Sequence, residues 1–339
     1  MAVPAVEIRR GDRVESVARA DAAVVDSSGR LVAWVGDPRR ETFWRSGAKP
    51  FQAIPVVASG AMAAWDMGVE ELAVIAGSHH GEPAHVQIVR GLLARLGASP
   101  TDLVSGPGWP LSHSARETLR RRGEVPDAVY GACSGKHAGM LALASQLGSP
   151  RTGYDQSSHP VQAAIARVVA LYCGYRETAR IPQALDGCGV PTFFLPLSRM
   201  AWAYARLGDP RGVPDLEGRA GLMVAEAMRR HPHLTAGADA LEVRLAHASG
   251  GRVVAKTAAE AVFCATIPER GWGLAFKMED GGGRTVPSMA AALLALVGPA
   301  EDEARDQLMG LARHGIHTAD GREAGEMAPV FQLQRGQVG

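Results

Sequence analysis

Residues 22–36 decide the fold of the start of the chain, and they read AAVVDSSGRLVAWVG. Two apolar runs flank the turn residues Ser27, Ser28 and Gly29, a pattern typical of a β-hairpin. The remainder of the first 45 residues also has the character of strands, with Gly36-Asp37-Pro38 ending the hairpin. The segment therefore predicts that the chain opens with antiparallel strands.

A second group of strands is predicted far along the chain, at residues 252–255, 261–267 and 272–278. Helices dominate between the two groups, from about residue 60 to 235. The clearest helical patterns cover residues 84–96, 114–122, 136–147, 160–172 and 218–230. Two further helices, 288–297 and 301–313, are predicted to close the chain.

The order of strands, helices and strands predicts an α+β fold and disfavours an alternating βαβα parallel sheet. We expect one antiparallel sheet, built from both chain ends and flanked by helices, with an inserted helical lobe. Residues 1–339 then form a single catalytic domain of two lobes. Residues 1–45 with 240–339 are predicted to form the sheet-containing lobe, and 46–239 the mainly helical lobe.

Charge and hydropathy exclude several classes of protein. The chain has 36 Lys and Arg against 35 Asp and Glu, a net charge of +1, which argues against a partner that is a nucleic acid or an anionic membrane. The apolar stretch 286–298 is shorter than the roughly 20 residues needed to span a bilayer. No apolar signal core follows the N-terminal charges, and there are only four cysteines. These features predict a cytoplasmic, reduced protein.

Ser46-Gly47-Ala48-Lys49 forms an S-x-x-K pattern at the start of a predicted helix, 46–59. Residues three apart on a helix share a face, so the hydroxyl and the amine can meet. A serine nucleophile needs such a base within about 3 Å. Pro50 fits the first helical turn, whereas Pro55 should kink the helix. The alternative is a helix cap followed by a surface lysine.

Two other polar segments follow apolar runs. Ser78-His79-His80-Gly81-Glu82 is either a loop that lines a cleft or the capping turn of the next helix. Lys256-Thr257-Ala258 lies among the late strands and resembles the K-T-G of serine β-lactamase sites, with Ala in place of Gly.

Two segments place a cysteine among small residues. Cys133 precedes a predicted helix and follows a short strand-like piece, 128–131, while Cys188 lies in the turn 186–189. Cys133 could be a nucleophile with His137, a metal ligand with Cys188, or a small buried residue. The residues alone leave these alternatives open.

Together these segments resemble one family. SGAKPFQAIP, GSHHGEP, CSGKHAGML, DGCGVP and KTAAEAVFCA occur in the order seen in the asparaginase II family, the Rhizobium-type L-asparaginases. The resemblance runs from the first hairpin to about Arg284. This chain departs from the family at Ala76-Gly77, where Cys-Ala is common, and at Ala258 and Ala261, where glycines are expected.

The resemblance implies a fold like that of serine β-lactamases and DD-peptidases, and a homodimer. It implies two Ser-Lys pairs in one site, which map to Ser46–Lys49 and Ser78–Lys256. It also implies a zinc ion, held by Cys133, Lys136 and Cys188. We expect the substrate to be bound by His79, Glu82 and Asp186.

The function implied is that of a cytoplasmic L-asparaginase, which hydrolyses the side-chain amide of L-asparagine to L-aspartate and ammonia. Ser46 would attack the amide carbon, Lys49 would accept its proton, and Ser78 and Lys256 would relay protons. One alternative is another β-lactamase-like serine hydrolase or amidase. A second is a non-catalytic, zinc-dependent binding protein.

Overall fold

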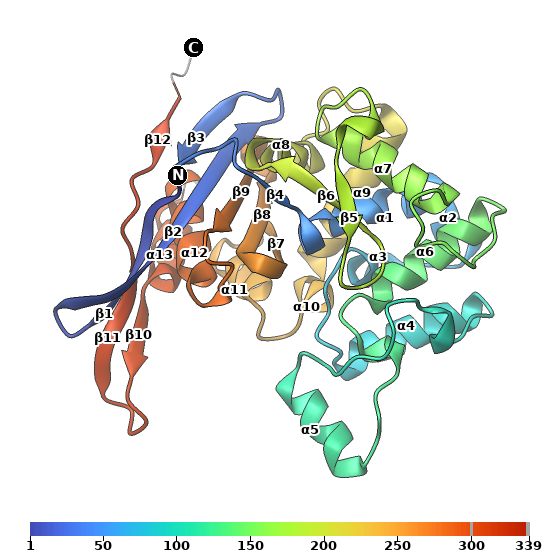
Figure 1. Ribbon diagram of the computed structural model, residues 1–339, viewed down its shortest axis with the longest axis horizontal. Coiled ribbons are helices and arrows are strands. Elements are labelled where there is room, and N and C mark those ends of the chain that lie inside the picture. The colour runs from blue at the N-terminus through green and yellow to red at the C-terminus, as the bar shows by residue number, and fades with distance from the viewer. Residues whose placement is uncertain (299–300, 337–339) are drawn as a thin grey trace. The chain divides into compact units, whose positions relative to one another are not determined.

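Residues 1–298 and 301–336 are described by a computed structural model (Figure 1). They divide into two units. The first comprises Met1–Gly47, Leu195–Arg211 and Arg244–Gly339, and the second comprises Ala48–Phe194 and Gly212–Val243. The first unit holds the sheet, and the second is mainly helical. The prediction of one catalytic domain made of two lobes stays a prediction.

The first unit contains an antiparallel sheet drawn from both ends of the chain, which confirms the predicted α+β fold. Its strands run in the order β10-β11-β1-β2-β9-β8-β7, with β3 beside β2 and β12 beside β3. Their bounds are β1 Val3–Arg10, β2 Arg13–Asp26, β3 Leu31–Val35, β7 Val254–Ala258, β8 Val262–Ile267, β9 Trp272–Met278, β10 His314–His317, β11 Glu323–Pro329 and β12 Gln334–Arg335.

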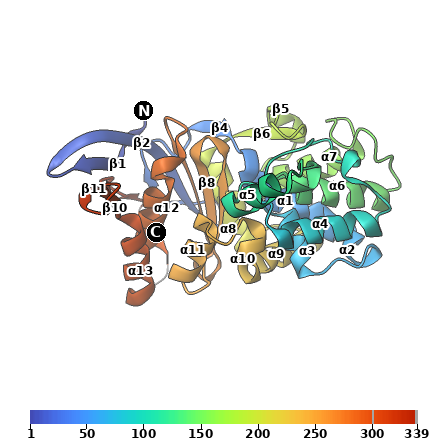
Figure 2. The ribbon, with the colours of Figure 1, turned by 90° about the horizontal axis from the view of Figure 1, so that it is seen from below.

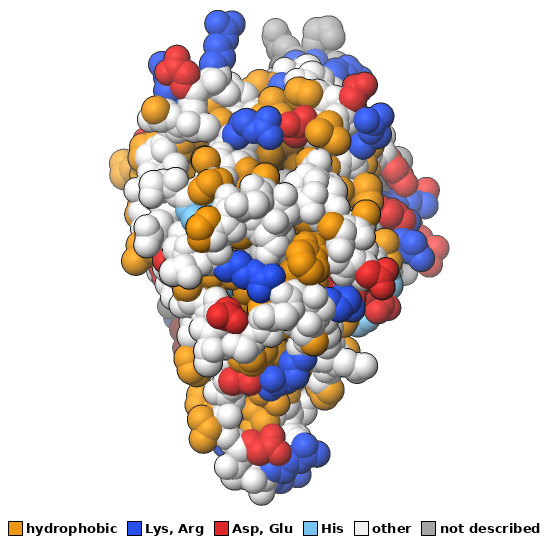
Figure 3. All heavy atoms as spheres, turned by 90° about the vertical axis from the view of Figure 1, so that its right-hand side faces the viewer, with side chains coloured by type: hydrophobic (Ala, Val, Ile, Leu, Met, Phe, Trp, Pro, Cys, Tyr) orange, Lys and Arg blue, Asp and Glu red, His pale blue; other side chains and the backbone are white. Residues whose placement is uncertain are grey.

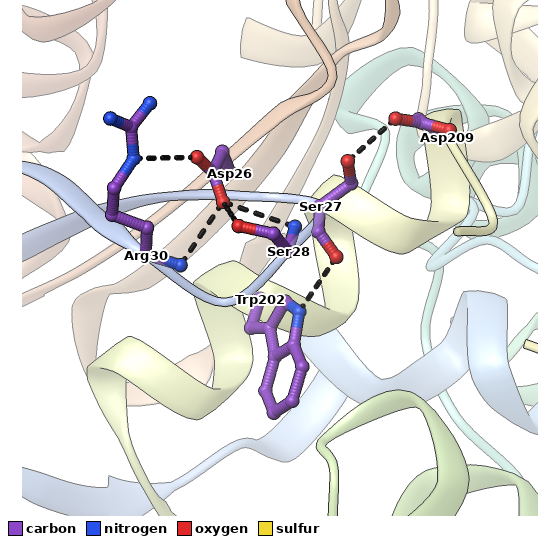
Figure 4. A network of polar contacts seen from close by, with 6 residues as sticks. All are labelled: Asp26, Ser27, Ser28, Arg30, Trp202 and Asp209. Carbon is purple, nitrogen blue, oxygen red and sulfur yellow. Dashed lines mark hydrogen bonds and ion pairs between the residues drawn. The ribbon is translucent and has the colours of Figure 1, made fainter. Parts of the chain in front are cut away.

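The hairpin predicted at residues 22–36 is formed by β2 and β3, and its turn is fixed by polar contacts (Figure 4). Asp26 Oδ1 accepts hydrogen bonds from the backbone N–H and the hydroxyl of Ser28, at 3.0 and 2.6 Å. Ser27 Oγ donates to Asp209 at 2.6 Å, and the Trp202 indole donates to the Ser27 carbonyl at 3.0 Å. The turn is thereby tied to helix α8, Leu197–Gly208, and to the residue that follows it.

Helices cover this sheet at close range. An added Cβ at Gly273 of β9 would lie 2.0 Å from the Ala201 carbonyl oxygen, so only glycine lets α8 approach here. Helices α12, Val286–Val297, and α13, Asp302–Ala312, lie together on one side of the β1–β2 part of the sheet (Figure 2). The first unit also contains β4, Glu41–Phe43. The 3-10 turn Arg45–Ala48 begins in this unit and ends in the second.

The second unit is built from helices around α6. They are α1 Lys49–Ala58, α2 Ala61–Ala64, α3 Val69–Ile75, α4 Pro83–Arg95, α5 His113–Arg122, α6 Ser134–Gln146, α7 Pro160–Tyr172, α9 Asp215–Arg230 and α10 Pro232–Thr235. Strands β5, Gln183–Leu185, and β6, Pro191–Pro196, form a hairpin whose turn contains Cys188, and β6 ends in the first unit. Helix α11, Leu241–Ala248, begins in this unit and ends in the first.

Helix α6 is buried from Ser134 to Ala144 among the helices packed around it, and α3 crosses it closely at two glycines. An added Cβ at Gly135 would lie 2.6 Å from the Val74 carbonyl oxygen, and one at Gly139 would lie 2.7 Å from the Ile75 side chain. The close crossing fixes the start of α6, where Cys133 and Lys136 lie.

Three local predictions differ from the structure. The prediction of a strand-like piece at 128–131 is wrong, because Ala128–Tyr130 forms a 3-10 helix. The Asp127 carboxylate caps this helix by accepting a hydrogen bond from Val129 N. The helix predicted from Ser46 begins instead at Lys49, after a 3-10 turn. The strand predicted at 252–255 begins at Val254 and extends to Ala258, so Lys256 lies within it.

The surface agrees with the balanced charge of the sequence. On the face in Figure 3, acidic and basic side chains are interspersed and separated by polar and apolar groups. Within the described residues, no helix has the length and apolar character needed to cross a membrane.

Candidate active site

Lys49 is the first residue of α1, and its side chain is 1% exposed. Its Nζ donates a hydrogen bond to Ser78 Oγ at 2.8 Å and another to the Ala132 carbonyl at 3.1 Å. A buried lysine is rare unless its amine is paired, and here hydroxyl and carbonyl oxygens supply the partners. The S-x-x-K lysine is therefore an interior group and not the surface lysine of the alternative interpretation.

The loop that carries Ser78 is held by backbone hydrogen bonds on both sides of the residue. Ser78 N donates to the Thr235 carbonyl at 2.8 Å, and His80 N donates to the Ala236 carbonyl at 2.7 Å. An added Cβ at Gly77 would lie 2.3 Å from the Thr235 oxygen. This close approach accounts for glycine at position 77, where the resemblance implied alanine.

His79 is fully buried, and its contacts define its tautomer. Nδ1 accepts a hydrogen bond from Gly81 N at 3.1 Å, so Nε2 carries the proton and donates to Ser134 Oγ at 2.7 Å. Ser134 Oγ in turn donates to the Val129 carbonyl at 2.7 Å. Burial, with the nearby charges of His85 and Lys49, holds the pKa of His79 well below its usual value. A neutral His79 thus connects the Ser78 loop to the start of α6.

Glu82 precedes α4 and is half-buried. Its Oε1 accepts a hydrogen bond from Ala238 N at 3.1 Å, and its Oε2 lies 4.0 Å from His85 Nδ1. These contacts are structural, and so are those of His79. The predicted binding of substrate by His79, Glu82 and Asp186 stays a prediction.

Cys133, Lys136 and Cys188 converge, as the resemblance implied. Lys136 Nζ lies 3.0 Å from Cys188 Sγ, and the two thiols share a hydrogen bond. That hydrogen bond, aided by the charges of Lys49 and Lys136, lowers the pKa of Cys133. The same hydrogen bond, together with burial, raises the pKa of Cys188. Burial lowers the pKa of Lys136, but its electrostatic interactions with Cys133 and Cys188 outweigh this effect, so the pKa is raised.

Asp186 begins the turn that carries Cys188. Its carboxylate accepts a hydrogen bond from Gly187 N at 2.6 Å, and its negative charge helps to raise the pKa of Lys136. Asp186 therefore belongs to the electrostatic environment of the cysteine–lysine cluster.

The donor set of this cluster fits a zinc ion. Two sulfur atoms and one amine come from separate segments, and thiolates are ligands that zinc prefers. Across the described residues, no group of three or more His, Cys, Asp or Glu side chains could hold a metal ion. Zinc here would thus depend on Lys136 as its third protein ligand, after loss of the lysine proton.

The first unit contains the other two predicted catalytic residues, Ser46 and Lys256. Lys256 is buried in β7, where it lies opposite Cys264 of β8, and its Nζ donates to the Thr257 carbonyl at 2.7 Å. Trp44 Nε1 lies 3.4 Å from Cys264 Sγ. An added Cβ at Gly47 would lie 3.6 Å from the same sulfur, so the Ser46–Gly47 segment lies near the strand opposite Lys256.

Two details of this unit bear on the chemistry. Burial raises the pKa of the Cys264 thiol to about 12, so this cysteine is not a nucleophile. Ala261, where the family pattern has glycine, still adopts a left-handed backbone with φ of 54°. The turn after β7 therefore has a backbone conformation that favours glycine, although alanine occupies the position.

The structure brings some predicted residues together and leaves other pairings as predictions. Lys49 contacts Ser78 and also the carbonyl next to Cys133, so it connects the predicted catalytic residues of the second unit with the cysteine–lysine cluster. The pairings Ser46–Lys49 and Ser78–Lys256 each join residues of different units. Both pairings stay predictions.

Sequence reasoning missed several contributors to the site. Ser134 stands inside the CSGKH motif and could have been noticed as its only hydroxyl. His137 Nδ1 lies 2.7 Å from the hydroxyl of Tyr154, which also accepts a hydrogen bond from Val104 N. Nothing in the sequence near Tyr154 indicates this contact. The position of Cys264 follows only from the register of β7 and β8.

The likeness to solved structures is limited. Mglu in its native form is 14% identical, with 82% of this chain and 63% of Mglu covered and a TM-score of 0.45. A beta-lactamase from Mycobacterium bovis is 15% identical, with 83% and 95% covered and a TM-score of 0.41. The chain thus spans less than two thirds of Mglu, and these TM-scores carry no further argument. A comparison with curated proteins gives no match.

The family comparison is more informative, because the model described as L-asparaginase II matches residues 6–329, nearly the whole chain. The matched region contains every residue placed above in the candidate site. The chain belongs to the asparaginase II family.

Proposed function

We propose that this protein is an L-asparaginase that hydrolyses the side-chain amide of L-asparagine by Ser-Lys nucleophilic catalysis. Family membership supports an asparaginase-type amidohydrolase. The observation that carries the mechanism is the partly buried hydrogen bond, 2.8 Å long, between Lys49 Nζ and Ser78 Oγ. A lysine amine held against a serine hydroxyl is suited to proton transfer during acyl transfer.

In the proposed reaction, Ser46 Oγ attacks the side-chain amide carbon while neutral Lys49 accepts the hydroxyl proton. Collapse of the tetrahedral intermediate breaks the C–N bond, and Lys49 returns the proton to the departing ammonia. Water then attacks the acyl ester, giving L-aspartate and free Ser46. Ser78 Oγ accepts a hydrogen bond from Lys49 Nζ. In this proposal, Ser78 relays protons together with Lys256. Arginine could not replace either lysine, because guanidinium does not lose its proton.

The cysteine–lysine cluster has a supporting part in this proposal. When bound by Cys133, Lys136 and Cys188, zinc would supply a Lewis acid for the polar end of the substrate. Lys136 also interacts with the Cys188 thiol without the ion, at 3.0 Å. A cytoplasmic location and a homodimer stay predictions.

The proposal is tested by ammonia release from L-asparagine, with L-glutamine and D-asparagine as comparison substrates. We expect turnover of L-asparagine with equimolar L-aspartate. Acylation by a penicillin without asparagine turnover would favour the β-lactamase-like alternative. Zinc binding with no hydrolysis of any of these amides would favour the non-catalytic alternative and contradict the proposal.

A further inference from the structure

A groove of about 540 Å³ lies between two helices of the second unit, α4 and α5. Figure 1 shows α5 set apart from the other helices of this unit. Each helix presents one face to the groove, because the lining residues follow helical spacing. The α4 face has Pro83, Val86, Gln87 and Arg90, and the α5 face has Ser114, Ala115, Thr118, Leu119 and Arg122.

The floor of the groove is apolar and its rim is cationic. Val86 and Leu119 are 9% and 5% exposed, and the ring of Tyr130 completes the floor. The rim carries the guanidinium groups of Arg90 and Arg122, and none of the described residues that line the groove is Asp or Glu. An apolar floor beneath positive charge complements an anion with an apolar body.

The two rim arginines differ in freedom. Arg90 Nη2 donates to Asp127 at 2.8 Å, and its guanidinium lies 5.9 Å from the centroid of the Tyr130 ring. Arg122 lies 3.9 Å from Glu124, and its side chain is 66% exposed. Arg90 is thus held in place, while Arg122 can turn toward a ligand.

The groove shares a wall with the loop that carries Ser78. Gly81 lines the groove, and an added Cβ there would lie 2.7 Å from the Tyr130 carbonyl oxygen. Ser112, the N-cap of α5, donates its backbone N–H to the His80 carbonyl at 2.9 Å. A ligand that displaces α5 would therefore pull directly on the loop between Ser78 and Glu82.

We propose that this groove binds a small carboxylate with an apolar body, and that its occupation changes amide hydrolysis through the Ser112–His80 hydrogen bond. The volume lies within the roughly 300–1,000 Å³ typical of small-molecule sites. The apolar part rests on Val86, Leu119 and Tyr130, and the carboxylate faces Arg122. The effect on hydrolysis rests on the proposed function, whereas the binding does not.

Binding is tested by titration calorimetry of the full chain with naphthalene-2-carboxylate, compared with the uncharged naphthalen-2-ylmethanol. We expect the carboxylate to bind at least about fivefold more tightly, since a charged hydrogen bond is added. Ala115→Trp fills the groove and should abolish binding. Arg122→Gln should weaken it at least about threefold, whereas Arg121→Gln, an exposed neighbour outside the groove, should not.

Equal affinity for the alcohol, or unchanged binding to Ala115→Trp, would overturn the assignment. Absence of binding at millimolar carboxylate would do the same, and would leave the groove to a peptide or a second copy. Arg122→Gln does not depend on the groove being filled, so it keeps the test valid if Ala115→Trp fails to fold.

The coupling is tested by the KM for L-asparagine with and without saturating naphthalene-2-carboxylate. We expect a change of at least about twofold in the native protein and none in Ala115→Trp. An unchanged KM despite calorimetric binding would overturn the coupling alone. Failure of asparagine turnover in the absence of ligand would contradict the proposed function and leave the binding result intact.

Discussion

Lys49 Nζ lies 2.8 Å from Ser78 Oγ, so the lysine of the first predicted Ser-Lys pair contacts the serine of the second. The sequence motif associates Lys49 with Ser46, three residues before it. In the proposed mechanism the two pairs are therefore not independent, because both serines depend on the amine of Lys49. Replacing Ser46 and replacing Ser78 should therefore have different effects on the turnover of L-asparagine, and not merely effects of different size.

We expect Ser46→Ala to abolish turnover of L-asparagine without unfolding the protein. Loss of a nucleophile typically lowers kcat by a factor on the order of 10⁶. Ser78→Ala should retain a measurable rate, because Lys49 keeps its second partner, the Ala132 carbonyl. The measurement is steady-state ammonia release, with circular dichroism to check folding. An active Ser46→Ala beside an inactive Ser78→Ala would make Ser78 the nucleophile.

Lys49→Arg and Lys256→Arg should both be severely impaired, because each lysine is assigned proton transfer and guanidinium retains its proton. Lys277→Arg is the matched control, since Lys277 is also buried in the sheet but has no assigned role. The measurement is kcat for L-asparagine. A near-native kcat in either of the first two variants would reduce that lysine to a structural cation.

The fold was largely predictable, because strands and helices at each end of the chain have distinct periodicities. The hairpin at 22–36 formed as expected, since apolar runs flank a turn whose Asp26 and Ser28 satisfy each other. Strands β10 and β11 were missed, because residues 314–329 are rich in Gly, His and charged residues. Their pairing with β1 depends on tertiary contact, which a local pattern does not contain.

Part of the candidate site was predictable only from the resemblance to a family and not from the spacing within one motif. The convergence of Cys133, Lys136 and Cys188 followed from the family order of segments. The contact of Lys49 with Ser78 was not predicted, because it depends on how α1 packs against the loop that follows α3. Side-chain pairs set by such packing are fixed by backbone distances and not by residue spacing.

Gly77→Ala should destabilise the protein by about 1–3 kcal/mol, the usual cost of overpacking. The new Cβ would lie 2.3 Å from the Thr235 carbonyl, so the loop must shift and Ser78 with it. Gly91→Ala is the control, because its Cβ meets only the Arg95 side chain at 3.9 Å. In the interior of α4 it should stabilise by about 0.5–1 kcal/mol. Urea denaturation measures both, and equal effects would contradict the assigned packing.

The free energy of unfolding should fall as the pH drops below about 6.5, the pKa of an unperturbed histidine. Burial keeps His79 neutral by lowering its pKa, so below that pH the unfolded chain binds a proton that the folded chain does not. Unfolding is then favoured by acid, by up to about 1.4 kcal/mol per pH unit for one histidine. Burial also lowers the pKa values of His85 and His137, so both contribute in the same direction.

His79→Gln should reduce the pH dependence of the free energy of unfolding by the contribution of one proton. His113→Gln, at an exposed position, should leave this pH dependence unchanged. The measurement is urea denaturation at several values between about pH 5 and 8. A slope unaffected by His79→Gln would show that this residue is protonated in the folded state.

We expect one zinc ion per chain, bound by Cys133, Lys136 and Cys188. The pKa of Cys133 is lowered, but those of Cys188 and Lys136 are raised, so zinc must displace about two protons. Affinity should then fall about a hundredfold for each unit by which the pH drops.

Elemental analysis of protein purified without a His-tag gives the stoichiometry, and competition with a chromophoric chelator at several pH values gives the affinity. Cys173→Ala, at a buried cysteine outside the cluster, should keep its zinc. Retention of zinc by a Cys133→Ala/Cys188→Ala double variant, or an affinity independent of pH, would contradict this set of ligands.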